Sequence, residues 1–186
     1  TICMLMGSCD AQTNSGTYDD QHMNLPYRFD NPDKIFVLPP ELIEVSGLTL
    51  SEEERYLIAV QDEWGHFFKI DRESGAFAAA FPFGKNGDYE GIEWVGETLY
   101  VVNSSGTLFG IAGAETDSQE VSDFQTFLTE DYDIEGLGYD KERHSLLLVC
   151  KEHPEGHDDR FVFSFDLNSM KLQTEPIFRL NQDSIQ

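Results

Sequence analysis

The sequence has few positive charges and few cysteines. Its 12 lysines and arginines stand against 35 aspartates and glutamates, which gives a formal net charge of −23 at pH 7. A surface this acidic repels phosphate backbones and anionic lipid headgroups, so it excludes nucleic acid as a partner and attracts cations. The 3 cysteines are an odd and sparse set, which excludes a disulfide framework.

Helical periodicity and the common catalytic motifs are also missing. No segment of useful length repeats its apolar residues at helical spacing, so an α-helical fold is excluded. A Gly-rich phosphate loop, H-E-x-x-H, G-x-S-x-G and a paired-cysteine motif are all absent. Hydrophobic residues nevertheless make up 40% of the chain, which is enough for a core in one domain of ordinary size.

The first residues resemble the end of a bacterial lipoprotein signal. Residues 2–8 are small or apolar and lead to Cys9, and a polar stretch follows. The apolar run is too short to span a bilayer. We expect residues 1–26 to be a signal remnant with a flexible tether, and Cys9 to carry lipid that holds the protein at the cell envelope. A plain secretory signal and a chance apolar start are the alternatives.

An internal repeat dominates the rest of the chain. Glu44, Glu90 and Glu135 each stand at the start of a similar apolar segment containing glycine, at spacings of 46 and 45 residues. Four strands recurring about every 45 residues are typical of β-propeller blades. After the first strand of each repeat, the sequence predicts second strands at 56–60, 98–102 and 145–149, third strands at 66–70, 107–111 and 160–165, and fourth strands at 76–83, 124–128 and 175–180.

One further apolar segment, residues 34–38, precedes the first repeat and has the position of a fourth strand. In a closed propeller, such a strand completes the last blade. The sequence therefore predicts an all-β partial propeller over residues 27–186, with three whole blades of four antiparallel strands and one closing strand. An open stack of sheets and a ring made by association are the alternatives.

With the repeats aligned, the chain resembles the SdiA-regulated, or YjiK/CarP-type, β-propeller family. The resemblance implies a six-bladed ring, an envelope location and a link to calcium, but it implies no defined reaction. The motifs that carry it are the segments 38–48, 60–65, 87–92, 103–106, 134–137 and 150–152.

The repeated glutamates are candidate ligands on the propeller axis. The first strand of each blade lines the central tunnel, so Glu44, Glu90 and Glu135 are expected to converge. Carboxylates about 7 Å apart repel by about 2 kcal/mol per pair at an effective dielectric near 20, so a cation, a proton or nearby donors must offset the repulsion. Ca²⁺ prefers such oxygen ligands. The ends of the second strands add Asp62 as a fourth metal ligand, and Glu63, Asn103, Ser104, Lys151 and Glu152 as ligand-binding residues.

The same residues could instead have purely structural roles. A glutamate at a strand start can accept backbone hydrogen bonds while its glycine permits a close approach, and Lys151 can neutralise one glutamate. The leading hypothesis is an envelope-anchored, non-enzymatic propeller that binds a divalent cation or a small polar ligand in the tunnel. The alternatives are a calcium-dependent phosphatase-like or esterase-like hydrolase, and a scaffold that binds a protein partner without chemistry.

Overall fold

The computed structural model describes residues 2–5, 30–156 and 158–181. Within these ranges the regular structure is β, apart from one short 3-10 turn, η1 (Pro40–Leu42). No helix in the described residues is long and apolar enough to cross a membrane. The prediction of an all-β chain is therefore confirmed.

Three antiparallel sheets follow one another along the chain, and we call them blades 1 to 3. Blade 1 contains β3 (Val45–Leu50), β4 (Tyr56–Gln61), β5 (His66–Asp71) and β6 (Phe77–Pro82). Blade 2 contains β7 (Tyr89–Val95), β8 (Thr98–Asn103), β9 (Thr107–Ala112) and β10 (Glu120–Gln125). Blade 3 contains β11 (Ile134–Asp140), β12 (Ser145–Cys150), β13 (Asp159–Asp166), β14 (Lys171–Leu172) and β15 (Phe178–Asn181).

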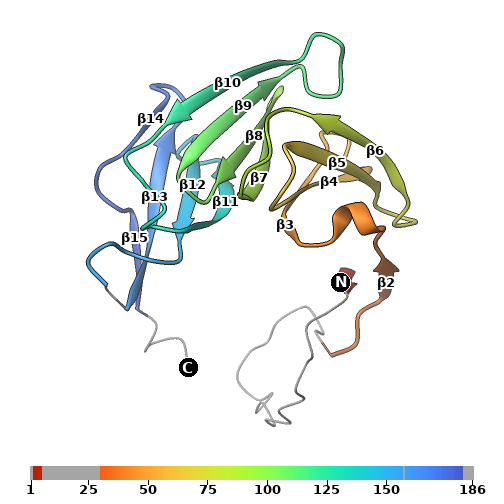
Figure 1. Cartoon of the computed structure of the whole chain (residues 1–186), viewed down its shortest axis with the longest axis horizontal. Helices are drawn as coiled ribbons and strands as arrows, with labels where there is room; N and C mark the ends of the chain where they lie inside the picture. The colour runs from red at the N-terminus through yellow and green to blue at the C-terminus, as the bar shows by residue number, and fades with distance from the viewer. Residues whose placement is uncertain (1, 6–29, 157, 182–186) are drawn as a thin grey trace.

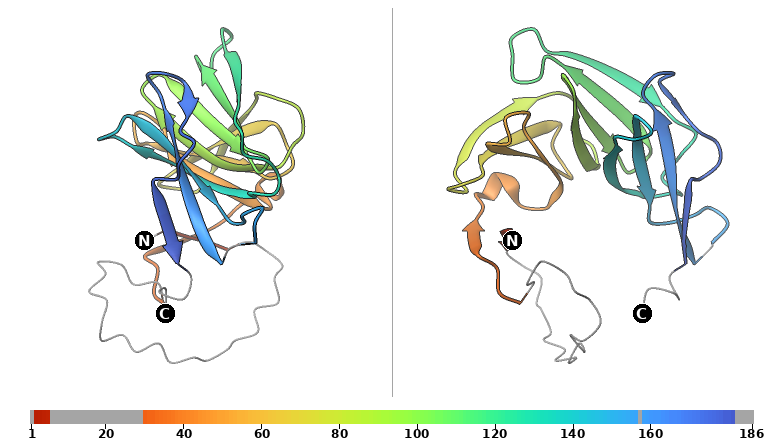
Figure 2. Two further views of the ribbon diagram at one scale, coloured as in Figure 1. Left: turned by 90° about the vertical axis from the view of Figure 1, so that its left-hand side faces the viewer. Right: turned by 180° about the vertical axis from the view of Figure 1, so that it is seen from behind.

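The blades are arranged along an arc (Figure 1). The first strands lie on its concave side, where β7 contacts both β3 and β11. The view from behind shows the same arc with the outer strands on its convex side (Figure 2). This is the architecture of a β-propeller over three blades, and it brings the starts of the first strands close to one another.

The hydrophobic core lies between blades rather than within one sheet. One cluster fills the space between blades 1 and 2 around Val60, Phe67 and Val101, and a second fills the space between blades 2 and 3 around Leu148. A third covers the other face of blade 1 beneath Leu42 of η1. The second strands pack on both faces, which explains why the sequence shows them as continuous apolar runs.

Two glycines permit the close approach of neighbouring first strands. A Cβ added to Gly47 would lie 2.9 Å from the backbone nitrogen of Ile92, and one added to Gly91 would lie 2.6 Å from Cβ of Leu137. Any larger residue would therefore push adjacent blades apart. Gly136, the matching residue of blade 3, faces only Val149 of its own sheet, at 3.5 Å.

The inner strands match the sequence-based ranges, but two outer strands do not. The fourth strand of blade 2 was expected at 124–128, and that prediction is wrong because β10 is Glu120–Gln125. This strand pairs only with β9 and is mostly exposed, so it needs no apolar run. The single fourth strand expected at 175–180 is divided into β14 and β15, and Pro176 between them has no N–H for the ladder.

The segment expected to close a last blade forms β2 (Lys34–Val37). It pairs in parallel with β1 (Ile2–Leu5), and a Cβ added to Gly75 in blade 1 would lie 2.4 Å from the Phe36 ring. Cys9 and most of the expected tether lie outside the described residues.

Candidate functional site: carboxylates at the axial end of the blades

Each first strand contains a β-bulge at its start. The pairing register shifts between Val45 and Gly47, between Tyr89 and Gly91, and between Ile134 and Gly136. The extra residues are therefore Ser46, Glu90 and Glu135. A bulge redirects the side chain of its extra residue, so this position can present a functional group at the end of the blade.

The pairing register shows that Glu44 is not equivalent to Glu90 and Glu135, contrary to the prediction from the sequence. Val45, Tyr89 and Ile134 all pair with the last residue of their second strand, so Ser46 is the counterpart of Glu90 and Glu135. Glu44 lies two residues earlier, where blades 2 and 3 have Asp88 and Asp133. Serine replaces glutamate at the bulge of blade 1, so the nearest glutamate in the sequence, Glu44, is not the counterpart of Glu90 and Glu135.

Backbone geometry at this earlier position supports the corrected alignment. Glu44 and Asp133 both adopt a left-handed conformation, with φ of 63° and 47°. Each blade thus has an acidic residue two positions before its bulge, a regularity that would have been visible in the sequence had the glycines been aligned first.

Glu90 lies among carboxylates from three consecutive blades. Partial burial raises the pKa of Glu90 to about 8, and a hydrogen bond shared with Asp88 and the charges of Glu135, Asp88 and Asp62 act in the same direction. Three of the four predicted metal ligands, Asp62, Glu90 and Glu135, are therefore near enough for their charges to interact. Asp88 belongs to the same group and was not predicted.

Lys151 compensates the carboxylates of blade 3. Its Nζ lies 2.7 Å from Oε1 of Glu135 and 3.0 Å from Oδ2 of Asp133. Hydrogen bonds to these two carboxylates raise the pKa of Lys151 above its usual range. The expectation that Lys151 neutralises a glutamate is confirmed, and the same contacts leave Asp62, Asp88 and Glu90 as the less compensated part of the cluster.

Asp62 connects the cluster to the joint between blades 1 and 2. Its backbone oxygen accepts a hydrogen bond from the N–H of Tyr89 at 3.3 Å. Its side-chain Oδ1 is inaccessible to solvent and has no hydrogen-bond partner among the described residues. A buried carboxylate oxygen without a donor is costly, so it is a natural contact point for a cation.

The remaining predicted residues do not gather at one point. Ser104 is buried and its main chain bonds to Asp88 and Ile134 at 2.9 and 3.0 Å, so it joins blades 2 and 3 structurally. Glu152 is exposed, and its Oε1 lies 4.0 Å from Nη2 of the half-buried Arg160. Glu63 is exposed, and Asn103 lines a cavity between the connection of β6 to β7 and blade 2.

The described residues contain no group of three or more His, Cys, Asp or Glu side chains that could hold a metal ion. The oxygen donors suit Ca²⁺ in kind. Their arrangement in this conformation does not suit direct coordination of the ion by three carboxylates. The cluster instead offers negative charge spread over three neighbouring blades.

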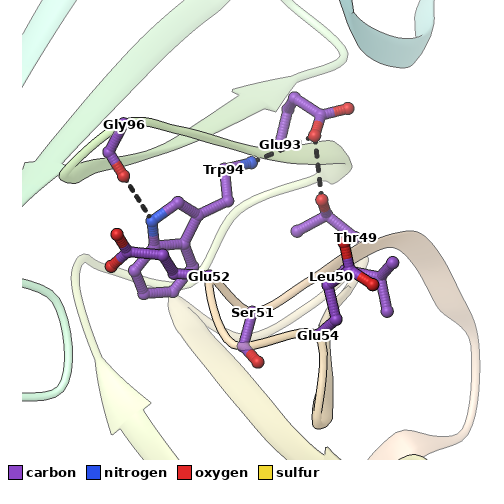
Figure 3. A pocket seen from close by; sticks show the side chains of 8 residues that line it. All are labelled: Thr49, Leu50, Ser51, Glu52, Glu54, Glu93, Trp94 and Gly96. Atoms are coloured by element: carbon purple, nitrogen blue, oxygen red, sulfur yellow. Dashed lines mark hydrogen bonds between the residues drawn. The ribbon is translucent and has the colours of Figure 1, made fainter.

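A second hollow lies at the opposite ends of the first strands (Figure 3). There Oγ1 of Thr49 donates to Oε1 of Glu93 at 2.9 Å, which ties β3 to β7. Trp94 donates its Nε1–H to the backbone oxygen of Gly96 at 2.8 Å. The first bond gives Glu93 a structural role at the joint between blades 1 and 2, and the second holds Trp94 against the turn between β7 and β8.

Comparison with known proteins identifies the repeat. The sequence profile of the SdiA-regulated family matches residues 37–169. A search of curated proteins finds no match.

Solved structures with a similar fold include the Kuenenia stuttgartiensis hydrazine synthase, at 16% identity and a TM-score of 0.52. Another is a putative 6-phosphogluconolactonase from Bacteroides fragilis, at 12% identity and a TM-score of 0.52. The matches cover 72% and 79% of this chain but only 37% and 42% of those chains. At these identities the likeness shows the fold alone.

Proposed function

Since the chain belongs to the SdiA-regulated family and folds as a partial β-propeller, we propose that it is a non-enzymatic binding protein whose axial end binds a small, positively charged ligand. The proposal rests on two observations: the charges of Asp62 and Glu135 act on Glu90 across three consecutive blades, and Oδ1 of Asp62 is buried without a hydrogen-bond partner among the described residues. Asp88 adds a fourth carboxylate beside Glu90.

The spread of the carboxylates favours a ligand that can bridge blades. Two kinds of ligand have positive charge over such a span: a Ca²⁺ ion that keeps much of its water shell, and an organic ammonium compound. Both benefit from the long-range attraction of a chain with a net charge of −23. Asp62 and Glu90 would provide the contacts, with Glu90 releasing its proton to solvent as the cation binds, while Lys151 would limit the contribution of Glu135.

Calorimetric titration of the full chain with CaCl₂ and, separately, with spermidine tests the proposal. We expect at least one of them to bind with a Kd below about 1 mM, and Glu90→Gln and Asp62→Asn to weaken that binding by about tenfold or more. Glu97→Gln is the matched control, because Glu97 is exposed in the turn between β7 and β8. The titrant that binds distinguishes a metal ion from an organic cation.

Absence of binding for both titrants at about 10 mM would refute the proposal. Equal affinities for the wild type and for Glu90→Gln would place any binding elsewhere. Turnover of p-nitrophenyl phosphate or p-nitrophenyl acetate that is lost in Glu90→Gln would replace the non-enzymatic reading with a hydrolase.

We also propose that lipid on Cys9 holds the protein at a bacterial envelope, with the propeller outside the bilayer. Support comes from the small and apolar residues 2–8 before this cysteine. Expression of the native gene with radiolabelled palmitate should label the wild type and a Cys3→Ser control but not Cys9→Ser. Label that persists in Cys9→Ser would show that lipid is attached elsewhere, and an unlabelled wild type would refute the lipid anchor.

A further inference from the structure

A cavity of about 450 Å³ lies between the connection of β6 to β7 and the outer strands of blade 2, and Asp62, Asp88, Glu90 and Glu135 are not among its lining residues. Its floor is aromatic, because Phe83, Tyr89 and Phe109 pack together with ring centroids 4.8 to 6.1 Å apart. One wall is the face of β9 and β10 that includes Thr107 and Gln125. The volume is in the range of about 300–1,000 Å³ that is usual for small-molecule sites.

The opposite wall, residues 83–87, is held in place by hydrogen bonds. Gly65 accepts the N–H groups of Phe83 and Gly84 at 2.8 and 3.1 Å, and Tyr89 Oη donates to the backbone oxygen of Lys85 at 2.7 Å. A Cβ added to Gly65 would lie 2.4 Å from the backbone oxygens of Gly84 and Lys85, so the contact requires glycine. A wall fixed in this way needs little ordering when a ligand binds.

Two side-chain amides in the lining, those of Asn103 and Gln125, use their oxygens in hydrogen bonds within blade 2. Oδ1 of Asn103 accepts the Thr107 N–H at 2.8 Å and the Ser105 hydroxyl at 3.0 Å, and Oε1 of Gln125 accepts the Thr107 hydroxyl at 3.2 Å. Among the described residues, no bond is formed by Nδ2 of Asn103 or Nε2 of Gln125. These two NH₂ groups are available as donors.

The charged residues of the cavity balance each other. Lys85 and Asp123 line it, and neither forms an ion pair within the part of the chain that the structure describes. The lining thus offers ammonium and amide donors, a carboxylate acceptor and an aromatic floor, with no net charge. A neutral ligand whose groups both donate and accept hydrogen bonds satisfies all of them, whereas an acidic or basic ligand would leave one charge opposed.

We propose that this cavity binds a neutral saccharide, with the sugar ring against Phe109 and its hydroxyl groups bonded to Asn103, Asp123 and Gln125. The site does not depend on the axial carboxylates, so it stands or falls separately from the cation-binding function. Every second residue of a strand points to the same face. In β10 this spacing places Val121, Asp123 and Gln125 in the same wall of the cavity.

Saturation-transfer NMR and calorimetry on the full chain test the proposal with maltose and N,N′-diacetylchitobiose as neutral probes. We expect at least one of them to bind with a Kd of about 1–10 mM. Gluconate and N-methylglucamine, which have similar hydroxyl groups but opposite charges, should bind at least about tenfold more weakly.

Variants of the exposed outer strand locate the binding. Asp123→Asn and Gln125→Ala should each weaken saccharide binding by about fivefold, the equivalent of one lost hydrogen bond, with an unchanged circular dichroism spectrum. Ser122→Ala is the matched control, because Ser122 is exposed and, as the neighbour of Asp123 in β10, points to the opposite face of the strand.

Three outcomes would overturn the proposal. The first is no binding of either neutral saccharide at about 50 mM. The second is tighter binding of gluconate or N-methylglucamine than of both saccharides. The third is saccharide binding that Asp123→Asn and Gln125→Ala leave as strong as Ser122→Ala does.

Discussion

The two joints between blades use the same backbone geometry with different side chains. Both have a bulge followed by a glycine that contacts the next first strand. At the joint of blades 1 and 2 the bulge residue is Ser46, whose hydroxyl donates to the backbone oxygen of Tyr89. At the joint of blades 2 and 3 it is Glu90, which faces the charge of Glu135.

The bulge position therefore has a structural role in blade 1, where it is serine, and a candidate functional role in blade 2, where it is glutamate. Serine satisfies a backbone acceptor and leaves no charge, so the first joint is stabilised by it. Glu90 at the second joint is partly buried and lies near other carboxylates. Both effects disfavour its charged form and lower the stability of the unliganded chain. Residues that destabilise the fold locally in this way are expected at functional sites.

The largest expected effect is on the glycine contact itself. Gly91→Ala should lower the free energy of unfolding by about 2 kcal/mol or more, because its Cβ would overlap Leu137 at the joint of blades 2 and 3. Gly136→Ala is the control, because its Cβ would meet Val149 only at ordinary contact distance. Urea unfolding at pH 7 measures both, and equal losses would mean that the inter-blade contact is not what requires glycine.

Ser46→Ala should have the next largest effect. Removal of the hydroxyl leaves the backbone oxygen of Tyr89 without this donor, which we expect to cost about 1 kcal/mol of unfolding free energy. The same urea titration provides the measurement, with Ser122→Ala on the exposed strand as control. A loss no larger than that of the control would contradict a stabilising role of the Ser46 hydroxyl at the joint of blades 1 and 2.

Glu90→Gln should stabilise the protein, and only at high pH. The pKa of Glu90 in the folded chain, about 8, lies above the ordinary value of 4.5, so the folded state keeps its proton longer than the unfolded state. Wild-type stability from this group is therefore present below pH 4.5 and is lost as the pH rises through 8. Glutamine cannot titrate, but it can still donate to Asp88.

In chelator-containing buffer, the variant should therefore have the wild-type melting temperature near pH 4.5 and one about 2–4 °C higher at pH 8.5. Thermal unfolding followed by circular dichroism checks this. An advantage that is constant with pH, or largest in acid, would contradict the assignment of a proton to Glu90.

The smallest effect is expected at Lys151. Its ion pairs with Asp133 and Glu135 are exposed, so Lys151→Met should cost less than about 0.5 kcal/mol at physiological salt. The loss should be greater in low salt, where screening is weaker. Urea unfolding at about 10 mM and 500 mM NaCl compares the two conditions, and a loss independent of salt would indicate a packing role instead.

Much of the fold was predictable because strands buried between blades have a strong sequence pattern. The inner strands of all three blades begin and end within about two residues of their predicted ranges, a normal uncertainty for strand boundaries. The outer strand β10 was misplaced because an edge strand packs on one side only and needs few apolar residues. Cys150 ends one such buried strand: its side chain is inaccessible, and burial raises the pKa of the thiol to about 12.

The candidate site was only partly predictable. Glu90, Glu135 and Asp62 were identified because the repeat marks the axial ends of the strands. Glu44 was aligned incorrectly and Asp88 was overlooked, because a bulge shifts the register by one residue without changing the apolar pattern on which the alignment depended.

The sequence by itself determined the blade repeat, the acidic character and the order of the strands, because these follow from local pattern and composition. Only the tertiary structure decided which acidic residues interact, that Lys151 compensates Glu135, and that Asn103 lines a cavity with β9 and β10. The physical reason is that the distances between groups in different blades depend on bulge position and glycine contacts, which are set when the blades pack against one another.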